Sequence, residues 1–373
     1  MTKTEATRQT KRELPDGWRW VRLGEIVHVR SGDFLPATRM DTHGEFPVYG
    51  GNGVAGFHSS YMFEEPKVLV GRVGALCGCV HLTKTKSWIT DNALYVDVKK
   101  CPLDDEFLFF WLTKMDLRGL ANQMGQPVIS GASLYAATCP LPPFHEQERI
   151  AVVLKQQMSA VDKAHAAAQA RLEAAMALPA ALGRQTLRDG QKQRRFLGDC
   201  LVEVRNGVGA DWGKYPVLGA TRAGLAPAKE AVGKTPERYK LADPGTVFYN
   251  PMRILLGSIA MVDEGDATGI TSPDYVVVKG RPGILDTRWF YYWFRSAQGA
   301  HLIDSLSRGA VRERILFNRL AAGKIELPDY ETQLHASARM KQVKPIVESV
   351  TKELKNINAL PAALLRRAFN GEI

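Results

Sequence analysis

Two stretches of the chain carry apolar side chains at steps that alternate between four and three residues. In the first, from about residue 145 to 188, the seam positions are Leu154, Met158, Val161, His165, Ala168, Leu172 and Ala175. In the second they are Val343, Val347, Val350, Leu354, Ile357, Pro361 and Leu364. This alternation is the heptad pattern of a helix that packs along one seam. We therefore predict two long helices, with His165 as a tolerated packing residue.

Each predicted helix contains the same five residues, Leu-Pro-Ala-Ala-Leu, at positions 178–182 and 360–364. A proline inside a helix removes a backbone hydrogen bond and bends the axis, so Pro179 and Pro361 should kink the helices at corresponding places. Pro345 has no counterpart in the first helix. It should add a further kink or delay the start of the second helix.

The segments that precede the two helices read as short strands divided by Gly, Pro and Asn turns, with helices at about 107–120 and 289–304. These segments also match each other. "RLGEIVHVRSG" resembles "FLGDCLVEVRNG", "FPVYGG" resembles "YPVLGA", "NALYVDVKK" matches "SPDYVVVKG", "FLFFWL" matches "WFYYWF" and "LPPFHEQ" resembles "LPDYETQ". The order is the same in both halves, so the chain is two copies of one unit.

These patterns predict a mixed α/β fold with a pseudo-twofold internal repeat. We expect a loose tail at 1–17, mixed domains at 18–142 and 191–328, and long helices at 143–190 and 329–373. Two long seams with little else to bury against should pack on each other as an antiparallel coiled coil. The alternative is that each helix packs on its own domain.

Of the composition, only the charge indicates a class of partner. Lysine and arginine number 49 against 39 aspartates and glutamates, which gives a net charge of +10 and a pI near 9.3. That balance favours nucleic acid first and acidic membranes second, although a solvated basic surface is an alternative. No apolar run approaches the roughly 20 residues that span a bilayer, and the N-terminus lacks an apolar signal core.

The five cysteines form no Cys-x-x-Cys pair. This pattern fits a reducing cytoplasm and argues against a disulfide framework or a structural zinc site. Cys77 and Cys79 stand in the apolar run "ALCGCVHL", which we interpret as one face of a buried strand.

A basic pseudo-twofold molecule with two unlike heads suits duplex DNA, because twofold proteins read two half-sites at a fixed spacing. A helix of about 44 residues spans roughly 65 Å, or about 19 base pairs. The helices would act as a ruler between two different half-sites.

The chain resembles the specificity subunits of type I restriction-modification enzymes. The resemblance rests on "LPDGWRWVRLGEI", "LPPFHEQERIAVVL", "GTVFYNPMRILLGSIAMVDEGDATGITSPDYVVVK" and "LPAALLRRAFNGEI", and it covers nearly the whole chain from Leu14. It implies the order target-recognition domain, conserved helix, second target-recognition domain, second conserved helix. It also implies a non-catalytic cytoplasmic subunit that reads a bipartite asymmetric DNA site.

The resemblance further implies two modification subunits that methylate adenine with S-adenosylmethionine, and restriction subunits that use ATP and Mg. This chain itself would need no cofactor and no metal. The duplicated helices would present two equivalent docking faces to the modification subunits. The candidate docking residues are Leu178, Pro179, Leu182, Leu360, Pro361 and Leu364.

Gly-rich turns supply the candidate DNA contacts of the first copy. Asn52 lies in "YGGNG" and Arg72 in "GRVGALCG", while Asn122 and Gln126 lie in "NQMGQPVISGAS". Arginine can fork onto a guanine edge or a phosphate, and small residues let backbone approach phosphate. The alternative for each is a plain turn.

The second copy offers arginines instead. They are Arg222 in "LGATRAG", Arg253 in "FYNPMR", and Arg308, Arg312 and Arg314 in "SRGAVRERILFNR". A solvated charge run is the alternative for the last group, and phosphate contact is the functional interpretation. The two copies differ chemically, as expected if they read different sequences.

"FYNPMR" also resembles the Asn-Pro-Pro-aromatic turn of adenine methyltransferases, but Met252 and Arg253 replace the second proline and the aromatic residue. We interpret Asn250 and Pro251 as a turn that aims Arg253. The sequence shows no metal pair, nucleophile elbow or phosphate loop. A stand-alone DNA-binding regulator, a methyltransferase or nuclease fragment, and a structural adaptor remain the alternatives.

Overall fold

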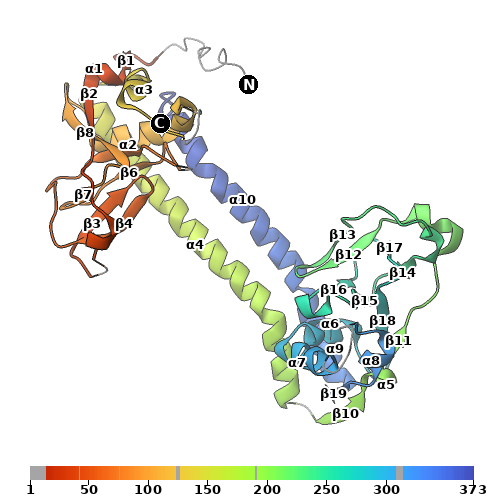
Figure 1. Ribbon diagram of the computed structural model, residues 1–373. Helices are drawn as coiled ribbons and strands as arrows, with labels where there is room; N and C mark the ends of the chain where they lie inside the picture. The colour runs from red at the N-terminus through yellow and green to blue at the C-terminus, as the bar shows by residue number, and fades with distance from the viewer. Residues whose placement is uncertain (1–13, 42, 75, 123–126, 190, 308–313) are drawn as a thin grey trace. The chain divides into compact units, whose positions relative to one another are not determined.

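The computed structural model describes residues 14–373 apart from residues 42, 75, 123–126, 190 and 308–313. The expected tail at 1–17 therefore lies largely outside the described residues. The chain forms two compact units (Figure 1). Unit 1 comprises residues 1–167 and 355–373, and unit 2 comprises residues 168–354. Each unit combines short strands with segments of the long helices, which confirms the mixed α/β fold.

Unit 1 is built on a four-stranded antiparallel sheet in the order β2-β8-β5-β6. A second sheet has the order β4-β3-β7, and β1 pairs with β9. The elements are β1 (Arg19–Arg22), α1 (Leu23–Ile26), β2 (Val27–Ser31), η1 (Ala37–Arg39), β3 (Phe46–Gly50), β4 (Gly53–His58), β5 (Val68–Gly71), β6 (Val80–Leu82), β7 (Trp88–Ile89), β8 (Ala93–Lys99), α2 (Asp105–Lys114), η2 (Leu117–Leu120), α3 (Gly131–Tyr135), β9 (Thr138–Leu141) and the first part of α4 (Phe144–Asp189).

Unit 2 repeats this plan. Its four-stranded sheet has the order β11-β18-β15-β16, and its pairs are β10-β19, β12-β13 and β14-β17. The elements are β10 (Lys192–Phe196), α5 (Leu197–Cys200), β11 (Leu201–Glu203), η3 (Gly209–Lys214), β12 (Leu218–Thr221), β13 (Gly224–Pro227), η4 (Pro236–Arg238), β14 (Lys240–Ala242), β15 (Thr246–Tyr249), η5 (Ile254–Leu256), β16 (Ile259–Val262), β17 (Gly269–Thr271), β18 (Val276–Gly280), α6 (Thr287–Phe294), α7 (Ala297–Ser307), α8 (Phe317–Ala321), β19 (Lys324–Pro328), α9 (Tyr330–Lys341) and the first part of α10 (Val343–Ala368).

An aromatic helix fills the core of each unit. In unit 1, Asp104 caps α2 by accepting a hydrogen bond from the Phe107 amide at 2.7 Å, and Phe107 and Trp111 are buried. In unit 2, Asp286 caps α6 by accepting from the Trp289 amide at 2.8 Å. An aspartate at this position satisfies an amide that the helix leaves unpaired.

A buried glutamine joins each long helical segment to the aromatic helix of its unit. In unit 2 the side-chain oxygen of Gln333 accepts a hydrogen bond from the Asp286 amide at 2.9 Å, and its nitrogen donates to the carbonyls of Ile284 and Pro328. Gln147 makes the equivalent bonds in unit 1. Its oxygen accepts from the Asp104 amide at 3.0 Å, and its nitrogen donates to two proline carbonyls.

Helix α4 is continuous for 46 residues and passes through Pro179. The second helical segment consists of two helices, α9 and α10, separated at Gln342. Pro345 explains the break, because it cannot donate to the carbonyl of residue 341 and its ring crowds that turn. The Gln342 amide instead donates to the Arg339 carbonyl at 3.2 Å. Of the two effects expected of Pro345, the structure shows an interruption of the helix at Gln342, whereas the helical segment itself begins at Tyr330 without delay.

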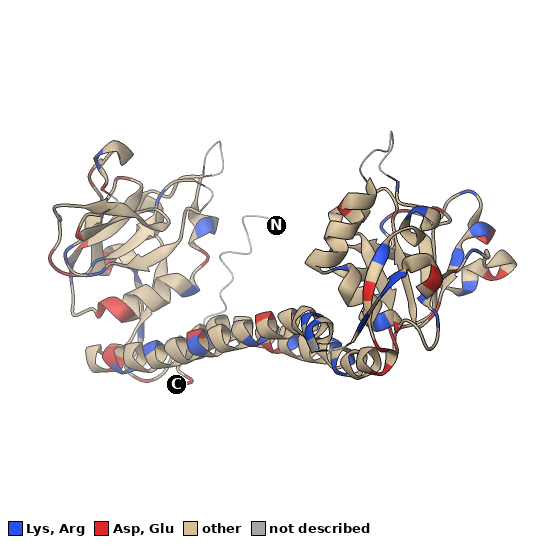
Figure 2. Ribbon diagram, turned by 90° about the horizontal axis from the view of Figure 1, so that it is seen from below, with Lys and Arg blue, Asp and Glu red and all other residues tan. Residues whose placement is uncertain are grey.

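The two long helices run antiparallel in unit 2. Arg171 of α4 pairs with Glu353 of α10 at 2.7 Å, whereas Pro179, later in α4, lies with Val343 beside one cavity. In unit 1, Leu154 of α4 and Leu365 of α10 share the hydrophobic core. The seam positions in the two helices are buried or half-buried except His165, which is exposed. The expectation that His165 packs in the seam is therefore wrong. Basic and acidic side chains both occur along the helix surfaces (Figure 2).

Three further details differ from the sequence prediction. The helix expected at 107–120 ends at Lys114 and a separate 3-10 turn follows, while the helix expected at 289–304 divides into α6 and α7. Cys77 and Cys79 lie in a loop, and β6 begins only at Val80. A glycine with φ +90° at position 78 turns the backbone between the two cysteines, which a strand does not allow.

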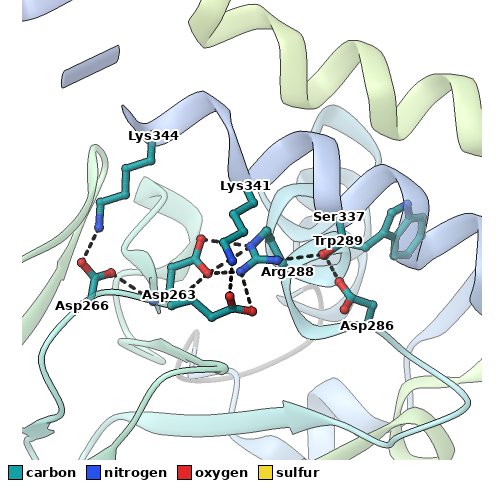
Figure 3. Close-up of polar contacts among 9 residues, drawn as sticks. Asp263, Asp266, Asp286, Arg288, Trp289, Ser337, Lys341 and Lys344 are labelled. Carbon is teal, nitrogen blue, oxygen red and sulfur yellow. Dashed lines mark hydrogen bonds and ion pairs between the residues drawn. The ribbon is translucent and has the colours of Figure 1, made fainter. Parts of the chain in front are cut away.

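A polar cluster ties α6 to α9 and α10 in unit 2 (Figure 3). The buried Arg288 donates to the carboxylate of Asp263 and to the hydroxyl of Ser337. At the margin of the cluster, Lys341 pairs with Glu264 and Lys344 pairs with Asp266. The cluster anchors the β16–β17 connection to the long helical segment.

Candidate nucleic-acid interface

The candidate contact residues of unit 1 lie on three neighbouring segments: the β3–β4 turn, the β5–β6 loop and the segment that contains Asn122. Asn52 is exposed in the two-residue turn between β3 and β4. The backbone of this turn lies against Gly71, where an added Cβ would come within 2.1 Å of the Gly51 oxygen. Only glycine fits position 71. The close approach places Asn52 beside Arg72.

Arg72 is half-buried at the start of the β5–β6 loop. Its amide donates to the Asn92 carbonyl at 2.9 Å, and its Nη1 donates to the Ser31 hydroxyl at 3.4 Å. Asn122 joins this group because Val128 bridges both Val73 and Asn122. The structure therefore brings Asn52, Arg72 and Asn122 together, while Gln126 lies outside the described residues.

An open depression of about 480 Å³ lies beside these loops in unit 1. It is lined by Gly50, Gly51, Asn52, Gly53, Val54, Ala55, Val73, Leu76 and Asn92. Its walls are glycine backbone, two asparagine amides and apolar side chains that include Val54, Val73 and Leu76. Such a surface admits close approach of a flat or groove-shaped partner.

Unit 2 gathers arginines in the corresponding loops. Arg222 is exposed in the β12–β13 turn, and Arg253 is exposed in the β15–β16 loop. The Asn250 side-chain oxygen accepts from the Met252 amide at 2.9 Å, which confirms the expected turn at Asn250 and Pro251. Arg314 lies nearby, because the Ile315 amide donates to the Pro251 carbonyl at 3.1 Å.

The structure thus groups Arg222, Arg253 and Arg314 on three neighbouring segments. Arg314 lies 3.8 Å from an oxygen of Asp274. Arg308 and Arg312 lie outside the described residues. Arginines on these segments can contact phosphates or guanine edges, as the sequence suggested.

Sequence reasoning did not single out Arg295, which connects the β12–β13 turn of unit 2 to β16 and α6. Its Nη2 donates to the Arg222 carbonyl at 2.6 Å, and its Nη1 donates to the Ile259 carbonyl at 3.0 Å and to the Tyr291 hydroxyl at 2.7 Å. Burial raises the pKa of Tyr291, which keeps the hydroxyl protonated beside the guanidinium. A basic residue at the end of a helix is an ordinary feature of sequences, so the pattern alone could not single it out.

Replacing Arg295 with alanine should loosen the β12–β13 turn. Loss of the charge-assisted bond to the Arg222 carbonyl should lower the local opening free energy by about 2 kcal/mol. Backbone amides at residues 218–227 should then exchange with deuterium about thirtyfold faster. Mass spectrometry of exchanged peptides measures this rate. Arg281→Ala, at an exposed arginine of the same unit, is the control, and equal exchange in both variants would contradict the bridging role.

The candidate docking residues divide by burial, and the division is similar in the two helices. Leu178 and Leu360 are exposed by 37% and 43%. Leu182 is buried in the core of unit 2, Pro179 is also buried, and Leu364 packs against the core of unit 1. Pro361 is half-buried. Leu178 and Leu360 are therefore the members of this group that a partner can reach most fully.

Among the described residues, no cluster of three or more His, Cys, Asp or Glu side chains could hold a metal ion. Within the same part of the chain, no helix is both long and apolar enough to cross a bilayer.

Comparison with known proteins shows which proteins this chain resembles. The model of the type I restriction modification DNA specificity domain matches residues 15–174. The specificity subunit of the type I restriction enzyme EcoprrI from Escherichia coli is 31% identical over 136 residues, which are 35% of this chain and 34% of that protein. The match thus spans about a third of that relative's length.

Solved structures extend the likeness of the fold over nearly the whole chain. The type I restriction-modification S subunit from M. genitalium superposes with a TM-score of 0.58 at 16% identity, covering 94% of this chain and 96% of that one. The HsdS subunit from Thermoanaerobacter tengcongensis gives 0.56 at 17% identity, with 98% and 99% covered. Residues 15–174 therefore match the DNA specificity domain of type I restriction-modification systems, and nearly the whole chain shares the fold of these solved subunits.

Proposed function

We propose that this chain is the non-catalytic DNA-recognition subunit of a type I restriction-modification enzyme, and that each unit reads one half of a bipartite, asymmetric site. One observation carries the proposal. The four-stranded sheets of the two units share one strand order, but corresponding turns present different side chains. In corresponding turns unit 1 offers the amide of Asn52 and unit 2 the guanidinium of Arg222, whereas the next loops both carry an arginine, Arg72 and Arg253.

Different side chains imply different half-sites. An asparagine amide pairs with the N6 and N7 atoms of adenine, and a guanidinium pairs with O6 and N7 of guanine. The net charge of +10 supports binding to the phosphate backbone, which should weaken steeply with salt. We further propose that the long helices set the spacing between the half-sites. Helix α4 has 46 residues, and a helix of that length spans roughly 70 Å.

Selection of bound duplexes from a randomised DNA pool tests this function. The chain is used together with its cognate methyltransferase subunit. Recovery of two different short half-sites at one fixed spacing would support the proposal. A single continuous motif, or no enrichment above a salt-sensitive background, would mean that the repeat serves assembly rather than sequence reading.

We also propose that the duplicated helices dock two methyltransferase subunits, and restriction subunits through them. S-adenosylmethionine, ATP and Mg would then be bound by those partners. The support is the repeated Leu-Pro-Ala-Ala-Leu sequence, whose first leucine is exposed in both copies. A buried leucine would only pack inside this chain. Two equivalent exposed leucines can each contact one copy of the same partner subunit.

Replacing Leu178 or Leu360 with aspartate should remove one methyltransferase subunit from the complex. A charge at the centre of an apolar contact should weaken that contact by about 2 kcal/mol or more, or roughly thirtyfold. Native mass spectrometry should show a stoichiometry of one for each single variant and none for the double variant. Val152→Asp changes another exposed apolar residue of α4 and is the control. Two bound subunits in all variants would exclude these leucines from docking.

A further inference from the structure

The β15–β16 loop of unit 2, residues 250–258, exposes three large apolar side chains. Met252, Leu255 and Leu256 are exposed by 68%, 44% and 72%. Leu255 and Leu256 belong to a 3-10 turn whose first residue, Ile254, is buried. Several large apolar groups on the exposed side of one short loop mark an interaction surface, because single exposed apolar residues are common but clusters are not.

The loop is held in place, so these side chains cannot simply fold inward. The Arg253 amide donates to the Asn250 carbonyl at 3.1 Å, and the Gly257 amide donates to the Ile254 carbonyl at 2.9 Å. Gly257 has φ +80°, a conformation that favours glycine, and closes the loop. The Ser258 hydroxyl then donates to the Ala220 carbonyl at 2.8 Å, which ties the loop to the neighbouring strand.

The corresponding β5–β6 loop of unit 1 is built differently at this position. Gly78, with φ +90°, closes the loop as Gly257 does in unit 2. Leu76 is 51% exposed and corresponds to Leu255, but the residue directly before the glycine is the buried Cys77, where unit 2 has the exposed Leu256. The exposed side chain directly before the closing glycine is thus a feature of unit 2.

Cations flank the apolar group in unit 2. Arg253 is in the loop itself, and the side chain of Arg222 reaches the loop at Gly257, where an added Cβ would lie 3.6 Å from its Cγ. Apolar side chains between arginines suit duplex DNA, because arginines hold phosphates while apolar wedges enter between base pairs. A methyltransferase subunit is the other possible partner of an apolar surface, but the two arginines favour a polyanion.

We propose that the β15–β16 loop inserts Leu256, supported by Leu255, as a wedge between two base pairs of the half-site that unit 2 reads. The proposal rests on the proposed function and deepens it, since it assigns a shape-reading role to residues that form no hydrogen bond with a base. Unstacking is easiest at pyrimidine–purine steps, so the wedge selects such a step. A loosened stack also eases extrusion of a nearby adenine for methylation.

The test uses the complex of the full chain with its methyltransferase subunits and the duplexes recovered by selection. 2-Aminopurine replaces each adenine of the unit 2 half-site in turn. The native complex should raise the fluorescence at the wedge step, and Leu256→Ser should abolish that rise. Leu256→Ser should bind the matched duplex about tenfold more weakly, and a duplex with a mismatch at that step less than about threefold more weakly, because the mismatch has already loosened the stack.

Two control variants separate a wedge from a general loss of structure. Leu256→Met keeps an apolar side chain and should retain fluorescence and affinity, and Val202→Ser, at an exposed valine of β11, should do the same. The wedge would be overturned if Leu256→Ser weakened binding to the matched and the mismatched duplex by the same factor. It would also be overturned if the only effect of Leu256→Ser were loss of the methyltransferase subunit from the complex. Both results leave the proposed function standing. Failure of the native complex to select any bipartite site would instead overturn the proposed function.

Discussion

Replacing Gln333 with alanine is expected to lower the free energy of unfolding of unit 2 by about 3 to 5 kcal/mol. The side chain is fully buried and forms three hydrogen bonds, to the Asp286 amide and to the carbonyls of Ile284 and Pro328. Alanine leaves these three backbone groups without a partner. Each buried group left in that state costs about 1 to 3 kcal/mol.

Denaturant unfolding followed by tryptophan fluorescence measures the change, since Trp289 is buried in the same core. Gln147→Ala should destabilise unit 1 by a similar amount. Glu331→Ala, at an exposed residue of the same helical turn, is the control and should cost less than about 1 kcal/mol. A loss below about 1 kcal/mol for Gln333→Ala would show that the glutamine does not join the helix to the domain.

Replacing Arg288 with methionine should also cost about 3 to 5 kcal/mol, because it leaves the largely buried carboxylate of Asp263 without its partner. Burial alone would lower the pKa of Arg288, but its hydrogen bonds and ion pairs with Asp263 and Glu264 raise it overall. The guanidinium therefore stays charged at every pH at which the protein is handled.

Combining Arg288→Met with Asp263→Leu should restore most of the lost stability, since a buried ion pair and an apolar pair of similar size are often equivalent. Lys341→Ala removes only the exposed pair with Glu264 and should change the free energy of unfolding by less than about 1 kcal/mol. Denaturant unfolding of the three variants measures these free energies. A double variant as unstable as Arg288→Met alone would contradict the account of the cluster.

The sequence predicted those features of the fold that depend on local pattern. The heptad steps identified the long helices because burial along one face repeats with the helical period. The break at Gln342 followed from Pro345. The run containing Cys77 was misinterpreted because a buried loop and a buried strand have similar apolar composition. Only the backbone turn at Gly78 distinguishes them.

The candidate site was predictable only in part. The turns that carry Asn52, Arg222 and Arg253 were visible as glycine-rich or Asn-Pro segments. Their grouping depends on long-range contacts, such as that between Arg295 and the Arg222 carbonyl, 73 positions apart in the chain. The burial of the candidate docking leucines also depends on tertiary contacts that the sequence does not reveal. Leu178 and Leu182 lie one turn apart in the repeated sequence, yet one is exposed and the other is part of the core.

The most direct test of two independent reading units is to compare the base preferences of Asn52→Ala and Arg253→Ala. Sequencing of duplexes bound by each complex gives the preference at every position of the site. Asn52→Ala should relax the preference within one half-site, and Arg253→Ala within the other, each by about 1 to 3 kcal/mol at the affected base pair. A uniform loss of affinity with both half-sites unchanged, or relaxation of the same half-site by both variants, would contradict the account.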